Sequence, residues 1–308
     1  MDLKQIEYFV QVAELGGFTR AASVLRVAQP ALSRQVRALE VELRQTLFDR
    51  NGRGVTLTPA GTRLLAHGRG ILQQVLRARQ DLEESRGAAT GVLSIGLPPS
   101  VSRTLTAPLV EAFRKRFPRA TLSVVEGLST YTLEWLQQGR VDCAVVYNAA
   151  PAAAIDLLPV LQERLWLVSA RRARGSAVGP PVTLAQLAAH EIVIPSRPHA
   201  IRMRLETVLA EAGLKPRVGL EIESVPAILD LVRKHALHAV LSLNAVAASG
   251  NAAAYTVQPV RISGRQMLST SLWIATSAQR PRGPLLEQAS GLLLELLRKQ
   301  LDSPKSGR

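Results

Sequence analysis

Hydrophobic positions near the start of the chain recur with helical spacing. Over residues 29–43 they fall at i, i+4, i+7 and i+11, which places them on one face of a helix. These residues are Leu32, Val36, Leu39 and Leu43. Residues 20–25 predict a short helix with Thr19 as its N-cap, and a tight turn over residues 26–28 separates the two helices. An apolar stripe over residues 3–13 predicts a helix that covers the pair, so the pattern is that of a helix-turn-helix.

The opposite face of the 29–43 helix carries side chains that suit DNA. Arg and Gln can make bidentate contacts with guanine and adenine edges in the major groove, and Ser can bind a base or a phosphate. The candidates on this face are Gln29, Pro30, Ser33, Arg34 and Arg37. An ordinary amphipathic helix with a solvated basic face is the alternative. The short turn and the proline at the start of the helix favour DNA binding.

Two short strand-like runs between residues 46 and 57 surround a glycine-containing turn, which predicts a β-hairpin. Arg50 and Arg53 lie at its tip. A basic hairpin beside a helix-turn-helix is a wing that can reach phosphates or the minor groove. We therefore add Arg50 and Arg53 to the candidate DNA-binding residues.

Residues 18–61, FTRAASVLRVAQPALSRQVRALEVELRQTLFDRNGRGVTLTPAG, closely resemble the N-terminal domain of the LysR-type transcriptional regulators. The runs AQPALSRQVRALE, LFDR and TLTPAG carry the resemblance, which implies that the five candidates on the helix lie along the DNA groove and that Arg50 and Arg53 belong to the wing. Weaker similarity covers the rest of the chain. Three later pieces are most similar to the nitrogen-assimilation-control and sulfur-control branch: LTAPLVEAFRKRFP (105–118), VDCAVVYN (141–148), and AIRMRLE (200–206) with EIES (221–224).

A long helix is predicted after the wing, with Thr58 as N-cap and Pro59 in its first turn. Apolar residues recur at spacings of 3, 4 and 7 as far as Leu82, and about 28 residues make a rod of roughly 40 Å. A small N-terminal domain cannot bury so long a stripe, so we expect it to pair with a second copy of the chain. Gly68 and Gly70 either weaken this helix or mark a close helix approach.

Strands and helices alternate beyond residue 91, as β-α-β-α-β over residues 92–147 and as a second set from about residue 164. This order predicts a parallel sheet in each of two lobes. Crossover strands that join such lobes make a bilobed, periplasmic-binding-protein-like receptor, and the family resemblance implies the same fold. The expected fold class is therefore α/β overall, in three parts. They are a winged helix-turn-helix (1–58), a linker helix and hinge (59–90), and an effector-binding domain (91–308) with lobe I at 91–162 and 266–308 and lobe II at 163–265.

Ligands of such sheets bind at the carboxyl ends of strands, near helix N-termini. The loops at 98–102, 126–130, 147–148 and 195–196 occupy these positions, and the last one precedes a helix that carries two arginines. The candidate effector-binding residues are Ser100, Ser102, Ser129, Thr130, Tyr147, Ser196 and Arg202. Helix capping is the alternative role for each Ser and Thr. Of Arg202 and Arg204, we expect one to face the cleft and the other to face solvent.

One segment departs from the family pattern. Ala236 and His238 stand where glycines are common, and Ser242 stands where a proline is common. Without glycine, a left-handed turn at the end of the preceding helix is costlier. His235 and His238 lack Cys or carboxylate residues at metal-ligand spacing, so we expect no metal and no cofactor.

Composition and charge narrow the class of protein. The 308 residues carry a single cysteine, Cys143, in a strand-like apolar run, which excludes a disulfide within the chain and suits the cytoplasm. The sequence shows neither a signal-peptide pattern nor an apolar run of roughly 18 residues, so we expect neither export nor a membrane span. Of the net charge of +14, residues 1–90 contribute +4 (13 basic, 9 acidic) and residues 91–308 contribute +10 (25 basic, 15 acidic). The positive charge beyond residue 90 favours binding of an anionic small molecule to this part of the chain. A genome-wide preference for arginine is the alternative explanation for the charge.

The function expected is that of a cytoplasmic, sequence-specific transcriptional regulator that responds to a small effector, an anion among the candidates. Its expected partners are double-stranded DNA, the effector, RNA polymerase and further copies of itself, as a dimer or a dimer of dimers. Motifs typical of enzymes, such as G-x-S-x-G, the P-loop and H-E-x-x-H, are missing from the sequence, so catalysis is not expected. A constitutive regulator with an empty pocket and a cytoplasmic solute-binding protein are the alternatives.

Overall fold

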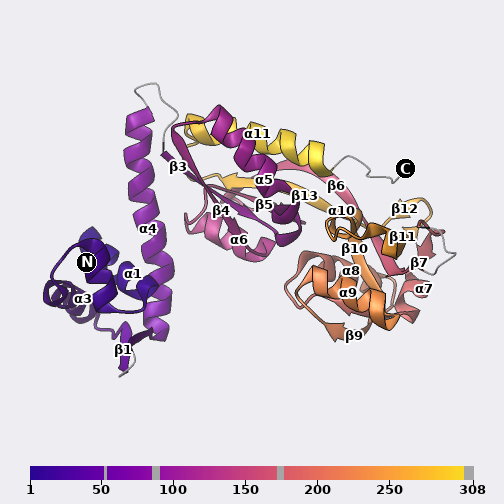
Figure 1. Cartoon of the computed structure of the whole chain (residues 1–308), viewed down its shortest axis with the longest axis horizontal. Helices are drawn as coiled ribbons and strands as arrows, with labels where there is room; N and C mark the ends of the chain where they lie inside the picture. Colours follow the sequence, from indigo (N-terminus) through magenta and orange to yellow (C-terminus); the bar gives the residue numbers. More distant parts are fainter. Residues whose placement is uncertain (52–53, 85–90, 172–176, 302–308) are drawn as a thin grey trace. The chain divides into compact units, whose positions relative to one another are not determined.

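The computed structural model describes residues 1–51, 54–84, 91–171 and 177–301 (Figure 1). The chain forms two compact units, the first built from Met1–Gly91 with Gln138–Arg140 and the second from Val92–Gln137 with Val141–Arg308. None of the helices in the described ranges is long and apolar enough to cross a membrane.

The first unit is a helix-turn-helix followed by a hairpin and a long helix. Its elements are α1 (Leu3–Leu15), α2 (Phe18–Leu25), α3 (Gln29–Leu43), β1 (Phe48–Asn51), β2 (Gly54–Leu57) and α4 (Pro59–Glu84). The predicted stripe of α3 is in the core, because Leu32, Val36 and Leu39 are each 0% exposed. Phe9 of α1 packs on Phe48 of β1, with ring centroids 5.2 Å apart. This core joins all three helices to the hairpin.

The prediction that Thr19 caps α2 is wrong. The helix begins one residue earlier, at Phe18, and Gly17 occupies the N-cap position without a side-chain cap. Phe18 is buried and its ring packs edge-on against that of Phe48, at 5.8 Å between centroids. This packing draws residue 18 into the helix and leaves Thr19 exposed in the first turn.

The long helix α4 begins as predicted, since Thr58 Oγ1 accepts a hydrogen bond from the Gly61 backbone N–H at 3.0 Å. Its first half packs on the core of the same unit through partly buried residues that include Leu64, Leu65, Ile71 and Leu72. Gly68 marks a close approach to α1, because a Cβ there would lie 3.0 Å from Val10 Cγ2. Leu76, farther along, is 47% exposed. The core of this unit therefore covers only part of the apolar stripe.

The second unit is built on a long sheet with the strand order β12-β11-β6-β13-β5-β3-β4. One end of it forms lobe I, in which α5 and α11 lie on one side of the strands and α6 on the other (Figure 1). The elements of lobe I are β3 (Gly91–Leu97), α5 (Pro99–Arg116), β4 (Ala120–Glu126), α6 (Ser129–Gln137), β5 (Cys143–Tyr147), the first part of β6 (Ile155–Ala170), β13 (Ser269–Ser277) and α11 (Pro284–Leu301).

The prediction of a wholly parallel sheet in lobe I is wrong, because the sheet is mixed. β3 and β5 are parallel, but β13 returns from lobe II and pairs antiparallel with both β5 and β6. The first ten residues of β6, 155–164, were not predicted as a strand. They contain Pro159 and alternate irregularly between polar and apolar, which weakens the strand pattern. The buried Cys143 packs in this core, and burial raises the pKa of its thiol.

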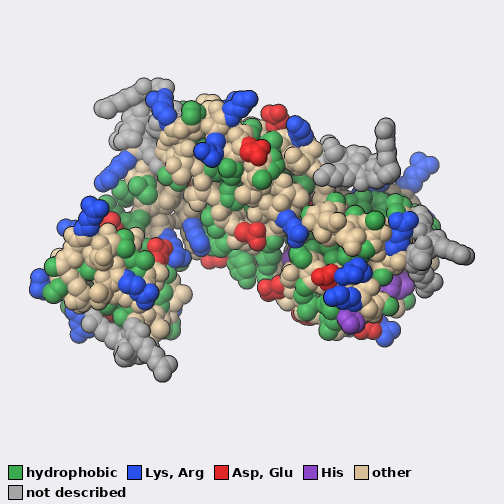
Figure 2. Space-filling model, viewed as in Figure 1, with side chains coloured by type: hydrophobic (Ala, Val, Ile, Leu, Met, Phe, Trp, Pro, Cys, Tyr) green, Lys and Arg blue, Asp and Glu red, His purple; other side chains and the backbone are tan. Residues whose placement is uncertain are grey.

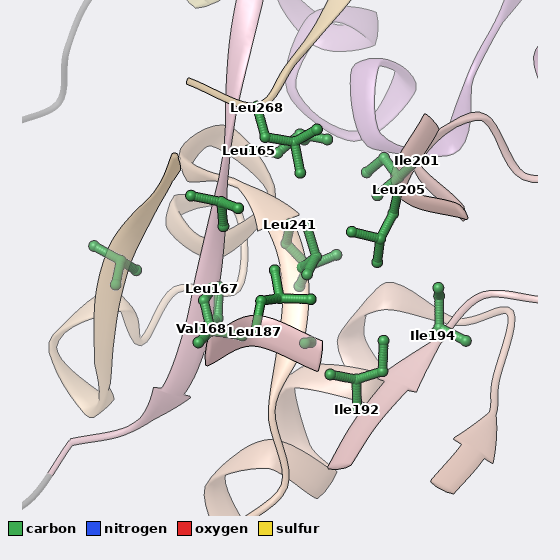
Figure 3. Close-up of a cluster of buried hydrophobic side chains, with 14 of the residues drawn as sticks. Leu165, Leu167, Val168, Leu187, Ile192, Ile194, Ile201, Leu205, Leu241 and Leu268 are labelled. Atoms are coloured by element: carbon green, nitrogen blue, oxygen red, sulfur yellow. The ribbon is translucent and has the colours of Figure 1, made fainter. Parts of the chain in front are cut away.

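Lobe II is built on the later part of β6 and packs around its own apolar core. Its elements are β7 (Val182–Thr183), α7 (Leu184–Ala189), β8 (Glu191–Ile194), α8 (Ala200–Glu211), β9 (Arg217–Glu221), α9 (Val225–His235), β10 (Ala239–Ser242), α10 (Leu243–Ala247), a 3₁₀ turn (Ala252–Ala254), β11 (Tyr255–Ser263) and β12 (Gln266–Met267). Figure 3 shows side chains of β6, α7, β8, α8 and β10 gathered in this core, among them Leu165, Leu187, Ile192, Leu205 and Leu241.

Helix α9 ends in a left-handed turn although it has no glycine there. Ala236 adopts a left-handed conformation with φ +53°. A left-handed conformation costs an L-residue about 1–2 kcal/mol, whereas glycine adopts it freely. The chain therefore carries a strained turn directly before β10.

We expect Ala236→Gly to raise the free energy of unfolding of the second unit by about 0.5–1 kcal/mol, after the greater flexibility of an unfolded glycine is subtracted. All 3 tryptophans lie in this unit, so their fluorescence during urea unfolding measures it. The matched control is Ala210→Gly, at an exposed position inside α8, which should lose about 1 kcal/mol. A loss of stability in both variants would contradict the interpretation.

Candidate DNA-binding surface and effector cavities

The structure brings the five predicted DNA-binding residues of α3 together. Gln29, Pro30, Ser33, Arg34 and Arg37 line one open depression on the outer face of the helix. All are exposed except Ser33, which is half-buried. Since the opposite face of α3 is in the core, the packing fixes which side chains point outward. Their contact with DNA stays a prediction.

Glu40 holds the end of α3 to the hairpin, a role that the sequence reasoning missed. Its side chain is only 6% exposed. Its Oε1 accepts hydrogen bonds from the backbone N–H groups of Leu47, at 2.9 Å, and Phe48, at 3.4 Å. Its Oε2 lies 3.7 Å from Nη1 of Arg37, which is 70% exposed. The sequence does indicate a buried role for Glu40, because this carboxylate lies at i+4 from Val36 on the apolar face of the helix.

The predicted wing is a hairpin with regular register. Phe48 pairs with Leu57, and Arg50 pairs with Val55. The side chain of Arg50 and the whole of Arg53 lie outside the described part of the chain. Their role as phosphate contacts therefore stays a prediction.

The second unit contains an apolar cavity of about 680 Å³ between lobe I and lobe II. The N-terminal ends of α5, α6, α8 and α9 border it, and Ser100, Ser129 and Tyr147 lie in its wall. Ser129 Oγ accepts a hydrogen bond from the Tyr147 backbone N–H at 2.9 Å, and Ser100 Oγ lies 3.4 Å from the Tyr147 hydroxyl. Three of the predicted effector-binding residues thus meet at one place.

His199 also borders the apolar cavity and was not predicted there. It is the N-cap of α8, and its Nδ1 accepts a hydrogen bond from the Ile201 backbone N–H at 3.3 Å. Burial lowers the pKa of His199 to about 4. At neutral pH the ring is therefore uncharged with its proton on Nε2, which makes it a hydrogen-bond donor.

A buried carboxylate lies behind Tyr147. Glu163 of β6 is 8% exposed. Its Oε2 accepts a hydrogen bond from the Tyr147 hydroxyl at 3.1 Å, and its Oε1 accepts one from Asn244 Nδ2 at 2.7 Å. Burial raises the pKa of Glu163, while hydrogen bonds from Asn244, Ser242 and Tyr147 act in the opposite direction. This network joins the end of β5 in lobe I to the start of α10 in lobe II.

The raised pKa of Glu163 predicts a pH dependence of stability. A carboxyl group whose pKa is higher in the folded than in the unfolded chain lowers the free energy of unfolding as the pH rises. The loss begins near its ordinary pKa of 4.5 and is complete above the raised pKa. Glu163→Gln should therefore be more stable than the parent above that window and similar to it below. Thermal unfolding across pH measures the difference.

Glu221→Gln is the control of opposite sign, because the hydrogen bond from Arg202 lowers the pKa of Glu221. That variant should be no more stable than the parent at neutral pH. If the stability difference between Glu163→Gln and the parent does not change with pH, Glu163 does not titrate in this range.

A second cavity, of about 1210 Å³, opens between α6 and α8. Thr130 lies in its wall, and Ser129 and Tyr147 border both cavities. Two other candidates, Ser102 and Ser196, line neither one. Ser102 Oγ instead lies 3.2 Å from Thr106 Oγ1, one turn along α5.

The candidate effector-binding residue Arg202 lines neither cavity, and Arg204 lines the second one instead. The expectation that the arginine outside the cleft faces solvent is wrong. The Arg202 side chain is buried, and its guanidinium contacts Glu206 Oε1 at 2.9 Å and Glu221 Oε2 at 2.8 Å. These contacts raise the pKa of Arg202. Residues two apart on a helix point to opposite sides, so only one of the two arginines can reach the cavity. The surrounding carboxylates, distant in sequence, decide which one.

Comparisons with known proteins match the N-terminal and C-terminal parts of the chain to two different families of domain. The model of the "LysR substrate binding domain" matches residues 86–298, and that of the "Bacterial regulatory helix-turn-helix protein, lysR family" matches residues 3–62. The nitrogen assimilation regulatory protein nac of Klebsiella aerogenes is 33% identical over 298 residues, which are 96% of this chain and 95% of that protein. Its counterpart in Escherichia coli K12 is 35% identical over 74% of each chain.

Among solved structures, full-length CbnR in complex with its target DNA is similar, with a TM-score of 0.70 and 24% identity over 97% of this chain and 100% of that one. A full-length variant of OxyR from Pseudomonas aeruginosa has a TM-score of 0.68 and 22% identity over 97% and 95% of the two chains. These two likenesses concern the fold. They agree with the predicted order of a helix-turn-helix and a bilobed α/β domain.

Proposed function

The chain belongs to the LysR family of DNA-binding transcriptional regulators, and we propose that it regulates promoters in the cytoplasm through the outer face of α3. The observation that carries the proposal is the common surface of the five α3 residues, opposite a face that packs into the core. Gln29, Ser33, Arg34 and Arg37 supply donors and acceptors for base edges and phosphates. Arg50 and Arg53 of the wing would contact phosphates.

We propose the functional boundaries 1–58 for DNA binding, 59–90 for linkage and dimerisation, and 91–308 for effector binding. Leu76 is exposed on the later half of α4, where a second copy of this helix would bury it. Two copies would read two half-sites, as helix-turn-helix dimers do. A dimer, or a dimer of dimers, would then present the second units to RNA polymerase.

The effector would bind between the lobes, at the cavity bordered by Ser100, Ser129 and Tyr147. Both lobes contribute to its wall, so a ligand that contacts both favours one arrangement of the lobes. The change would alter the spacing of the DNA-binding pairs. A regulator that acts without an effector is the alternative, and it would show no ligand effect on promoter binding.

Footprinting on the intergenic region upstream of the protein's own gene tests the proposal. We expect protection of two half-sites about one helical turn or a multiple apart, with binding that weakens as salt rises. The footprint should persist when unrelated duplex DNA is added in excess. If no promoter fragment is protected or retarded, the assignment of α3 to the DNA groove fails.

A further inference from the structure

The second cavity has a composition that the proposed function does not explain. Its wall includes three arginines, Arg164, Arg204 and Arg265, but only one carboxylate, Glu134. Elsewhere on the visible face of this unit, basic side chains are spread out and in several places lie beside acidic ones (Figure 2). The cavity is therefore a local concentration of positive charge in a concave surface.

The floor of the cavity is one face of the β6–β13 ladder. Gln162 pairs with Ser271, and Arg164 pairs with Ser269, and all four residues line the cavity. Residues two apart on a strand point to the same side, so the four polar side chains project together. Thr270, between the two serines, and Leu272, directly after them, alternate to the opposite side of β13 and are buried.

The two helices at the sides each present one face to the cavity. On α8 the lining residues follow the spacing i, i+3, i+4, i+7, and on α6 they follow the same spacing. They are Ala200, Met203, Arg204 and Thr207 on α8, and Thr130, Leu133, Glu134 and Gln137 on α6, where Ser129 at the start of the helix also lines the cavity. Lobe I and lobe II thus contribute opposite walls over a common floor.

Two of the arginines lie beside Ser269. Arg204 Nε donates a hydrogen bond to the Ser269 carbonyl oxygen at 3.3 Å, and Arg164 lies directly across the ladder from Ser269. Arg265 comes from the turn between β11 and β12, at the rim. In the part of the chain that the structure describes, none of the three forms an ion pair with a carboxylate. Arg202, by contrast, is neutralised by two glutamates.

Asn148 adds a fixed donor. It follows β5 in a left-handed conformation with φ +50°. Its Oδ1 accepts hydrogen bonds from Thr270 Oγ1 and from the Ser271 backbone N–H, each at 3.0 Å. These bonds use only the oxygen and fix the side chain against β13. The amide NH₂ group therefore remains available as a donor in the cavity wall, where Asn148 lies.

We propose that this cavity binds a small anion with two or more negative charges, a polycarboxylate or a phosphate compound. Guanidinium groups bind both kinds of anion through pairs of parallel hydrogen bonds, and uncompensated arginines favour a charge greater than one. The hydroxyl and amide groups of the floor and walls supply further donors. The inference rests on the proposed function only in taking this anion as a ligand that regulates DNA binding. An anion held by Arg164, Arg204 and Thr130 would connect the two lobes.

Calorimetric titration of the full chain, without DNA and at fixed ionic strength, tests the proposal. The probes are citrate for polycarboxylates and pyrophosphate for phosphates, with acetate as the singly charged comparison. We expect saturable binding of citrate or pyrophosphate, one per chain, and much weaker binding of acetate. The preference between the two probes identifies the class. If neither binds, the proposal is overturned.

Variants locate the site. Arg164→Ala and Arg265→Ala, both at exposed positions, should each weaken binding by at least about tenfold, because a charge-assisted pair of hydrogen bonds is lost. Arg217→Ala is the matched control at an exposed position outside both cavities and should leave the affinity unchanged.

Two further variants test other places for the anion. Arg103 lines the apolar cavity and Arg34 lies on the DNA-binding face. If binding is lost in Arg103→Ala or Arg34→Ala and kept in Arg164→Ala, the anion binds elsewhere and the proposal is wrong. The titration contains no DNA, so a failure of the proposed function would appear separately, as lack of promoter binding.

Discussion

Arg34→Ala is expected to weaken binding to a specific operator by about 1–3 kcal/mol, which is roughly 5- to 150-fold. Arg34 is exposed in the middle of the polar face of α3, with Ser33 beside it and Arg37 one turn away. Its loss removes a side chain able to bind guanine bidentately, and the buried face of the helix remains intact. Fluorescence anisotropy with operator DNA and with a scrambled duplex of equal length measures both affinity and discrimination.

The ratio of the two affinities is the informative quantity. A base contact predicts that the operator loses more affinity than the scrambled duplex. A phosphate contact predicts equal losses and a salt slope that falls by about one. Arg63→Ala, at an exposed position on α4, is a control for the loss of one positive charge and should leave discrimination unchanged. If Arg34→Ala keeps both affinity and discrimination, Arg34 does not enter the groove.

Glu40→Ala should lower the stability of the first unit by roughly 2–4 kcal/mol, because it leaves the N–H groups of Leu47 and Phe48 buried without their acceptor. The wing begins at Phe48, so the change also releases the wing from α3. Hydrogen–deuterium exchange of peptides that cover residues 39–57 measures the effect locally. We expect faster exchange there and unchanged exchange in the second unit.

Glu40→Gln is the matched variant, since its side-chain oxygen can still accept from both N–H groups while the negative charge near Arg37 is lost. Exchange in this variant should stay close to that of the parent. Equal acceleration in both variants would show that the charge, rather than the acceptor, holds the wing. Unchanged exchange in Glu40→Ala would contradict the structural role.

Much of the fold followed from local patterns in the sequence. The helical stripe of α3 and the Thr58 cap of α4 were predicted because each depends on residues within one or two turns of each other. The left-handed turn at Ala236 was indicated differently, by the resemblance to a family in which a glycine is common at that position. Thr19 was misjudged because an aromatic contact with Phe48, thirty residues away, extends α2 by one residue.

The sequence by itself determined that α3 has one apolar and one basic face, since helical periodicity assigns the faces without any other part of the chain. Only the tertiary structure decided which arginine of α8 lines the second cavity. Arg202 and Arg204 have equal chemistry, but Glu206 and Glu221 hold the first and leave the second beside Ser269. Charge pairing depends on which groups meet in space. Arg202 meets Glu221 only when α8 and β9 have folded together in lobe II, and Arg204 meets Ser269 only when α8 lies against β13.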